Sequence, residues 1–163
     1  MSINVKQPFN KQYSDINTEF YTTEETVRKL IPFLDKSKRY IEPFDRVGNS
    51  KIYSVLKVEG FDIIRLRTDY NKEDDYDNRI IITNPPFISR GGLYSKMSRQ
   101  CEEMYLLMPL FSYNCYTKHR DKDKCNRWSD NWEKENLFPV LEFNTPEGVK
   151  KVSCVFSHWK KNV

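Results

Sequence analysis

The chain has 163 residues, enough for one domain with a sizeable core but not for a second, large recognition domain. Aromatic residues make up 14% of it and charged residues 31%, so the composition excludes an intrinsically disordered chain and indicates a packed, soluble one. No stretch is apolar enough to predict a membrane span or a secretory signal, so we expect a cytoplasmic protein without a membrane partner.

The charges are only slightly unbalanced. Lys and Arg number 27 against 23 Asp and Glu, a net charge of +4, which permits a polyanionic partner such as DNA without requiring one. The cysteines are scattered and predict reduced thiols rather than a disulfide framework: Cys101, Cys115, Cys125 and Cys154. The function must therefore be sought in local motifs.

The amino-terminal part predicts an arm followed by a helix. Residues 1–20 are polar without a clear period and are expected to lie as an arm on the domain. Apolar residues at helical spacing then predict a helix over residues 24–35. Thr22 or Thr23 can act as its N-cap, and Pro32 can end it early.

A strand, a turn and a helix are predicted over residues 39–60, where the helix ends at Gly60. Residues 61–67 predict a second strand, with Asp69 beyond its end. An acidic side chain at such a strand end can bind ribose hydroxyls. Residues 70–78 are mostly charged and predict a loop.

The centre of the chain predicts a buried strand that ends abruptly. Three consecutive isoleucines within residues 79–83 favour a strand buried on both faces. Asn84-Pro85-Pro86-Phe87 follows at once, and Pro85 restricts Asn84 to an extended conformation while neither proline offers an N–H. The rigid turn would present two acceptors, the side-chain oxygen of Asn84 and the carbonyl of Pro85.

Such a turn can act on a nucleobase. Two fixed acceptors can bind the hydrogens of a conjugated amine and localise its lone pair for attack. Phe87 can stack on a base taken out of the duplex. The turn also lies at the carboxyl end of a strand, where open α/β sheets bind ligands. The alternative interpretation is a proline-terminated strand that enters an ordinary loop.

Asn84-Pro85-Pro86-Phe87 after a hydrophobic strand resembles the catalytic motif of the S-adenosylmethionine-dependent N6-adenine DNA methyltransferases, including their small phage- and restriction-type members. The resemblance spans roughly residues 20–159. It implies an α/β fold that is class I methyltransferase-like (Rossmann-like), with a mostly parallel sheet and a C-terminal antiparallel hairpin. The catalytic residues that it implies are Asn84, Pro85, Pro86 and Phe87.

The resemblance also implies S-adenosylmethionine as the cofactor. Phe20-Tyr21-Thr22 resembles the family's Phe-Tyr-Thr-Pro segment near the methionine end of the cofactor, although a helix N-cap explains it equally well. Glu42-Pro43 and Gly48 match the family's Asp/Glu-Pro-x-x-Gly-x-Gly segment. The implied cofactor-binding residues are Tyr21, Thr22, Glu42, Pro43, Gly48 and Asp69.

Two departures from the family pattern oppose an intact cofactor site. Arg46 stands at the first glycine position, where a side chain must swing away or fill the pocket. Residues 70–78 replace a strand and a helix that line the adenine pocket in the family. The adenine end of the site is therefore expected to be trimmed.

The chain after the turn is expected to complete the sheet. Residues 88–92 predict a flexible loop, residues 93–103 a helix and residues 104–111 a buried strand, in the order that the resemblance implies. Residues 138–143 and 149–159 predict a hairpin, since the segment between them is rich in turn residues.

Residues 112–136 predict a charged insertion. Its interleaved basic and aromatic residues can contact phosphates and bases if DNA is bound, whereas a solvated surface loop is the commoner explanation. The candidate nucleic-acid-binding residues are Lys118, Arg120, Lys124, Arg127 and Trp128.

Two Cys/His pairs share one spacing, Cys115 with His119 and Cys154 with His158. Metal ligation by residues four apart needs a helix, and the second pair falls on a predicted strand, so no metal site is predicted. A Cys/His nucleophile would also lack an acyl-transfer context.

Two functional hypotheses follow. The first is a DNA adenine-N6 methyltransferase that uses S-adenosylmethionine, with DNA as its partner. The second is a catalytically degenerate methyltransferase fold that binds DNA or a protein partner as an accessory or anti-restriction module. The small size is compatible with a partner subunit or a homodimer. Affinity for S-adenosylmethionine distinguishes the two hypotheses.

Overall fold

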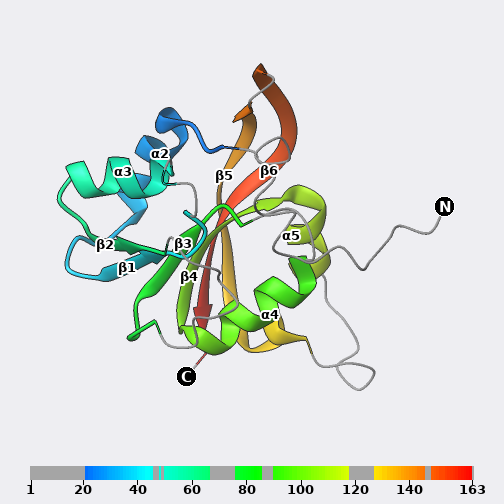
Figure 1. The fold of residues 1–163 in the computed structure, drawn as a ribbon. Coiled ribbons are helices and arrows are strands. Elements are labelled where there is room, and N and C mark those ends of the chain that lie inside the picture. The colour runs from blue at the N-terminus through cyan, green and yellow to red at the C-terminus, as the bar shows by residue number, and fades with distance from the viewer. Residues whose placement is uncertain are drawn as a thin grey trace, which may run out of the picture.

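The computed structural model describes residues 21–45, 48, 50–66, 76–85, 90–117, 127–145 and 148–162 (Figure 1). Within these residues six strands form one sheet in the spatial order β2-β1-β3-β4-β6-β5. The strands β1 to β4 are parallel to one another, whereas β6 is antiparallel to both of its neighbours. Their bounds are β1 (Arg39–Glu42), β2 (Asp62–Arg65), β3 (Ile80–Thr83), β4 (Glu103–Pro109), β5 (Trp132–Thr145) and β6 (Gly148–Lys161).

Helices cover both faces of the sheet (Figure 1). The helices α2 (Glu24–Leu30) and α3 (Lys51–Val58) pack on one face, and α4 (Arg90–Gln100) and α5 (Leu110–Thr117) on the other. Two 3-10 helices, η2 (Ile31–Phe33) and η4 (Trp128–Asn131), complete the described elements. This mixed arrangement is the expected class I methyltransferase-like fold, with a terminal antiparallel hairpin joined to a parallel sheet.

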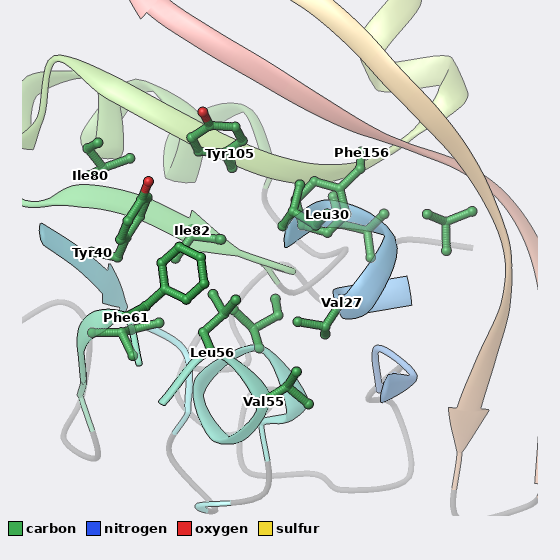
Figure 2. Packing of buried hydrophobic residues seen from close by; sticks show 14 of the residues in the cluster. Val27, Leu30, Tyr40, Val55, Leu56, Phe61, Ile80, Ile82, Tyr105 and Phe156 are labelled. Carbon is green, nitrogen blue, oxygen red and sulfur yellow. The ribbon is translucent and has the colours of Figure 1, made fainter. Parts of the chain in front are cut away.

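Strand β3 is buried on both faces, as the isoleucine run predicts. Ile80 and Ile82 belong to the core under α2 and α3, which Figure 2 shows from close by. Ile81 points to the opposite core, beside α4. Because successive side chains of a strand alternate between faces, the run supplies apolar contacts to both layers.

Local sequence accounts for the two helices of the first layer. The side chain of Thr23 accepts a hydrogen bond from the Thr26 N–H at 3.2 Å, so Thr23 is the N-cap of α2. Pro32 lies in η2, and the α-helix ends at Leu30, earlier than the full predicted range. Ser50 caps α3 in the same way, and Gly60 follows that helix with a φ of +88°.

Three boundaries differ from the sequence-based expectation. Residues 90–92 belong to α4 rather than to a flexible loop, because the helix begins shortly after the Asn84-Pro85 turn. Strand β4 ends at Pro109, which cannot donate to the ladder, and Leu110 starts a helix. The predicted insertion over residues 112–136 is not a single loop, since α5, η4 and the start of β5 occupy its described part.

The terminal hairpin is longer than predicted, with β5 beginning at Trp132 and β6 ending at Lys161. The buried indoles of Trp132 and Trp159 anchor it to the core beside α4. In none of the described ranges does a helix combine the length and apolar character that crossing a bilayer requires.

The strand order reverses between β1 and β3. The chain passes from β1 to β2 on one side and then returns to β3 on the other side of β1. In open α/β sheets, ligands bind in the crevice outside the carboxyl ends of the strands at such a reversal. A functional site is therefore expected at the carboxyl ends of β1 and β3.

Candidate functional site

Two of the predicted site residues meet at this strand reversal. Glu42 is the last residue of β1, and Asn84 directly follows Thr83, the last residue of β3. The two strands pair in parallel, with Ile41 opposite Ile81. Asn84 is half-buried and Pro85 is buried, so the chain is still inside the protein directly after β3.

A hydrogen bond joins the ends of β1 and β3. The hydroxyl of Thr83 donates to Oε1 of Glu42 at 2.5 Å, and the same oxygen accepts the backbone N–H of Phe44 at 2.9 Å. Glu42 is only 2% exposed and Thr83 is fully buried. The Glu42 carboxyl group thus connects the end of β3, directly before Asn84, with the loop after β1.

Burial raises the pKa of Glu42 to about 8, because an ionised carboxylate loses its hydration there. The hydrogen bonds from Thr83 and Phe44 oppose this increase, and the nearby Asp45 adds to it. The carboxyl group is therefore mostly neutral at pH 7. A neutral acid at this position avoids leaving an unpaired charge inside the sheet.

The loop after β1 is fastened by a second buried acid. Asp45 is 1% exposed, accepts the Ser50 N–H at 2.9 Å and forms an ion pair with Arg65 at 3.2 Å. Arg65 also donates to the Gly48 carbonyl at 3.4 Å and lies 4.4 Å from the ring centre of Tyr53. The end of β2 thus holds the loop in place from the neighbouring strand.

Gly48, the glycine that matches the family pattern, has a positive φ. Its φ is +77°, in the left-handed region that a side chain disfavours. Glu42 and Pro43, the other two matched residues, are buried. Arg46 lies outside the described residues.

The segment before α2 is tied to the terminal hairpin. Tyr21 and Asn144 exchange two backbone hydrogen bonds of 2.8 and 3.0 Å. Thr22 follows and is 6% exposed, yet its hydroxyl has no hydrogen-bond partner within the described part of the protein. Because buried hydroxyls are normally paired, this atom is suited to a polar group of a ligand.

Sequence reasoning missed Thr83, Asp45 and Arg65. A threonine after three isoleucines was one available signal, because a buried hydroxyl needs a partner. Asp45 and Arg65 lie 20 residues apart, and their pairing follows only from the register of β1 with β2, in which Glu42 lies opposite Arg65.

The predicted nucleic-acid-binding residues are only partly described. Arg127 donates to the Cys115 carbonyl, and its guanidinium lies 5.9 Å from the ring centre of Tyr116. The indole of Trp128 packs within an aromatic cluster whose ring centres lie 5.0–6.1 Å away: Tyr94, Tyr116, Trp132 and Trp159. Both side chains therefore hold α5 and η4 together, and a contact with nucleic acid stays a prediction.

The remaining predicted site residues lie outside the described part of the chain: Pro86, Phe87, Asp69, Lys118, Arg120 and Lys124. The described part contains no cluster of three or more His, Cys, Asp or Glu side chains arranged for a metal ion. Of the two Cys/His pairs, Cys154 and His158 lie on β6, where His158 contacts Glu103 at 2.8 Å.

The described residues fit an amino-acid-bearing nucleoside such as S-adenosylmethionine. Ligands bind at such a strand reversal in open α/β sheets, Gly48 has a left-handed backbone, and the buried Thr22 hydroxyl has no hydrogen-bond partner among the described residues. The ion pair between Asp45 and Arg65 holds the loop after β1, which contains Gly48. These observations support a cofactor site at the ends of β1 and β2.

Comparisons with known proteins agree on the fold. No protein-family model matches the chain, and no curated protein matches it. The solved structure of the 23S rRNA methyltransferase ErmE is similar, with a TM-score of 0.56, 12% identity, and coverage of 89% of this chain and 70% of that one.

Two further structures are similar to a comparable extent. A dimethyladenosine transferase from Plasmodium falciparum gives a TM-score of 0.55 at 14% identity, covering 88% of this chain and 63% of that one. A Pyrococcus horikoshii protein described as an RNA methyltransferase gives 0.51 at 11% identity, covering 90% and 88%. Likeness at such low identity establishes the class I methyltransferase fold and leaves the activity to the site.

Proposed function

We propose that this protein transfers a methyl group from S-adenosylmethionine to the exocyclic amine of an adenine in a nucleic acid. The observation that carries the proposal is the position of Asn84-Pro85, which leaves a fully buried strand at the strand reversal, beside the carboxyl group of Glu42. The names of two structural neighbours, an rRNA methyltransferase and a dimethyladenosine transferase, support an adenine in RNA as a substrate beside the DNA that the motif suggests.

In this proposal the turn orients the amine. The side-chain oxygen of Asn84 and the carbonyl of Pro85 accept its two hydrogens, and Phe87 stacks on the extruded base. When bound, S-adenosylmethionine supplies a methyl group on a sulfonium, so that attack by the amine nitrogen forms the N–C bond, breaks the C–S bond and releases one proton to water.

The cofactor would be held at the ends of β1 and β2. Thr22 offers a hydroxyl, Gly48 a close backbone, and Glu42 an acid that fixes the loop through the Phe44 N–H. Tyr21, Pro43 and Asp69 remain proposed contacts from the family resemblance. Because Glu42 is mostly neutral at pH 7, its main role would be to shape this loop rather than to attract the sulfonium charge.

Titration calorimetry with S-adenosylmethionine, followed by methyl transfer to adenine-containing RNA and DNA, tests the proposal. We expect the wild-type chain to bind the cofactor and methylate at least one polymer. Asn84→Ala should reduce turnover by about 100-fold or more while cofactor affinity is retained, because only an acceptor for the amine is lost. Asn136→Ala, a change on the exposed part of β5, is the matched control.

Failure of the wild-type chain to bind S-adenosylmethionine would overturn the proposal. An Arg46→Gly variant then separates the causes, since recovered binding would mean that the Arg46 side chain closes the site. Nucleic-acid binding without any cofactor binding would instead support the degenerate, binding-only module. Full turnover by Asn84→Ala would remove the turn from the mechanism.

A further inference from the structure

The side-chain bond between β1 and β3 has a direct structural link to the catalytic turn. Thr83 is joined to Asn84 by one peptide bond, and Pro85 limits the conformations that Asn84 can adopt. The position of the Asn84 side chain therefore depends on where the end of β3 is held. The hydroxyl of Thr83 joins this end to β1, through Glu42, while the Thr83 backbone pairs with Leu106 of β4.

Resting on the function proposed above, we propose that Thr83 is a positioning residue for Asn84, and that it acts through its hydrogen bond to Glu42. The carboxyl group would then set the loop after β1 and the catalytic turn together, because one oxygen accepts both the Thr83 hydroxyl and the Phe44 N–H. Movement of either donor would therefore displace both the loop after β1 and the turn after β3.

Packing alone does not explain the threonine. Thr83 is fully buried at the end of a strand whose other residues are isoleucines, and valine would fill nearly the same volume there. A buried hydroxyl lowers stability unless it is hydrogen-bonded, and Glu42 is its partner in the described structure. Each member of the pair thus satisfies the other, which favours one defined geometry.

The bond also depends on the charge of Glu42. A hydroxyl donates more strongly to an ionised carboxylate than to a neutral acid, so the bond should tighten as Glu42 loses its proton. Among the described residues, the other charged groups near Glu42 are Asp45, on the loop after β1, and Arg65, at the end of β2, and these two are paired with each other. Titration of Glu42 therefore reports on the bond itself.

Nuclear magnetic resonance tests the proposal without relying on catalysis. The carboxyl carbon of Glu42 and the side-chain amide of Asn84 are followed from pH 5 to 10, with the amide signal assigned by its absence in Asn84→Ala. In the wild-type protein we expect both signals to shift with one midpoint, near pH 8. In Thr83→Val the Glu42 midpoint should rise, because a donor is lost, and the Asn84 signal should no longer follow it.

Two matched variants keep the result interpretable. Thr83→Ser retains a hydroxyl and should restore the common titration, whereas Glu42→Gln retains an acceptor but cannot ionise and should make the Asn84 signal independent of pH. An Asn84 signal that ignores the wild-type titration, or follows it equally in Thr83→Val, would overturn the proposal.

Kinetics then separate positioning from binding. If the protein methylates an adenine, Thr83→Val should lower kcat about 10- to 100-fold and leave KM for S-adenosylmethionine unchanged, with Thr83→Ser close to wild type. A wild-type chain that transfers no methyl group would contradict the proposed function, while the resonance experiment would still decide whether Thr83 couples Glu42 to the turn.

Discussion

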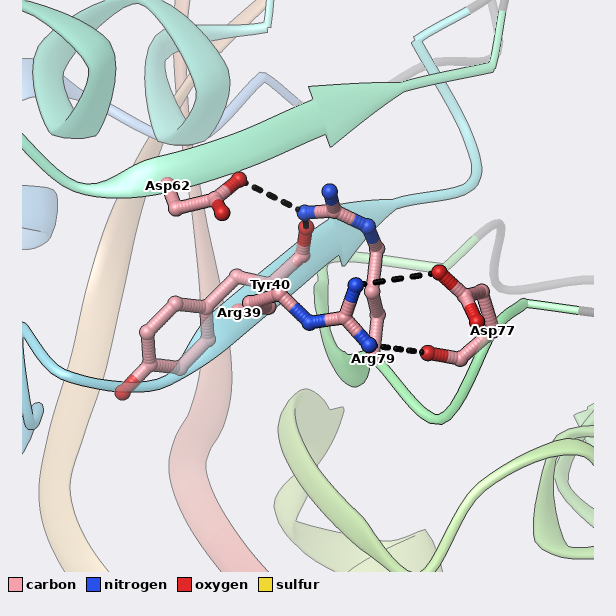
Figure 3. A network of polar contacts seen from close by, with 5 residues as sticks. All are labelled: Arg39, Tyr40, Asp62, Asp77 and Arg79. Atoms are coloured by element: carbon pink, nitrogen blue, oxygen red, sulfur yellow. Dashed lines mark hydrogen bonds and ion pairs between the residues drawn. The ribbon is translucent and has the colours of Figure 1, made fainter.

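The polar side chains at the amino ends of the parallel strands are held differently from those at the carboxyl ends. At the amino edge, Arg79 forms an ion pair with Asp62 at 2.8 Å and donates to the Tyr40 carbonyl at 3.1 Å (Figure 3). Beside it, Arg39 contacts the carboxylate of Asp77 at 3.0 Å and its carbonyl at 2.8 Å. These pairs keep one or both partners in water.

At the carboxyl edge the acids are inside the protein. Glu42 and Asp45 are at most 2% exposed, and within the described ranges only Asp45 has a cationic partner, Arg65. Groups held in this way are fixed before any ligand arrives, whereas exposed pairs rearrange at little energetic cost. The carboxyl edge therefore holds its acids inside the protein, whereas the amino edge joins the strand ends with pairs that reach into water.

Removing a cation should distinguish the edges most strongly. Arg65→Met would leave the carboxylate of Asp45 buried without its partner, and we expect a loss of about 3 kcal/mol in the free energy of unfolding. Arg39→Met removes a pair whose Asp77 side chain is 78% exposed, and the loss should be below about 0.5 kcal/mol. Urea unfolding followed by circular dichroism measures both, and equal losses would contradict the contrast between the edges.

The next effect is a pH dependence from Glu42. Its pKa lies near 8 in the folded protein, above its ordinary value of 4.5, so the folded state binds an extra proton between these values. Wild-type stability should therefore fall as the pH rises from about 5 to 8 and then level off.

Glu42→Gln should remove this part of the slope, since the amide keeps an acceptor and cannot ionise. We expect the variant to exceed the wild type in unfolding free energy at pH 9, by on the order of a few kcal/mol. Glu102→Gln, at an exposed position next to β4, is the control. A slope that is the same with and without Glu42 would show that the carboxyl group is ionised in the folded state.

The smallest effect should have the opposite pH dependence. His158 holds the pKa of Glu103 below its usual range through a hydrogen bond of 2.8 Å, against the partial burial that raises it. This pair contributes stability at neutral pH that is lost as the pH falls through the lowered pKa. Glu103→Gln should cost about 1 kcal/mol at pH 7 and progressively less as the pH falls below 4.5. Thermal unfolding across that range checks the sign.

The sequence was sufficient for the central strand and for its end at Thr83. The isoleucine run predicts β3, and Pro32 predicts the early end of α2. Both predictions depend only on neighbouring residues. Helix α5 was missed, because Leu110–Thr117 contains aromatic and polar residues of modest helix propensity. Packing of Tyr113 and Tyr116 against the core stabilises it instead.

The side-chain contacts at the site could not be predicted from the sequence. Thr83 and Glu42 lie 41 residues apart, and their meeting depends on which strand β3 joins and in which register. A shift of one residue would turn Thr83 to the other face of the sheet. Motifs thus located the strand ends, whereas the pairing of side chains across them required the structure.

The place of β6 has a consequence for how the protein is made. This strand lies between β4 and β5, so the edge of β4 stays without its neighbour until residue 161 has left the ribosome. An unpaired, apolar strand edge can pair with other chains during synthesis. Because β5 and β6 form a local hairpin, they can pair within microseconds and dock together. Slow translation between residues 109 and 148 should therefore favour aggregation of the nascent chain.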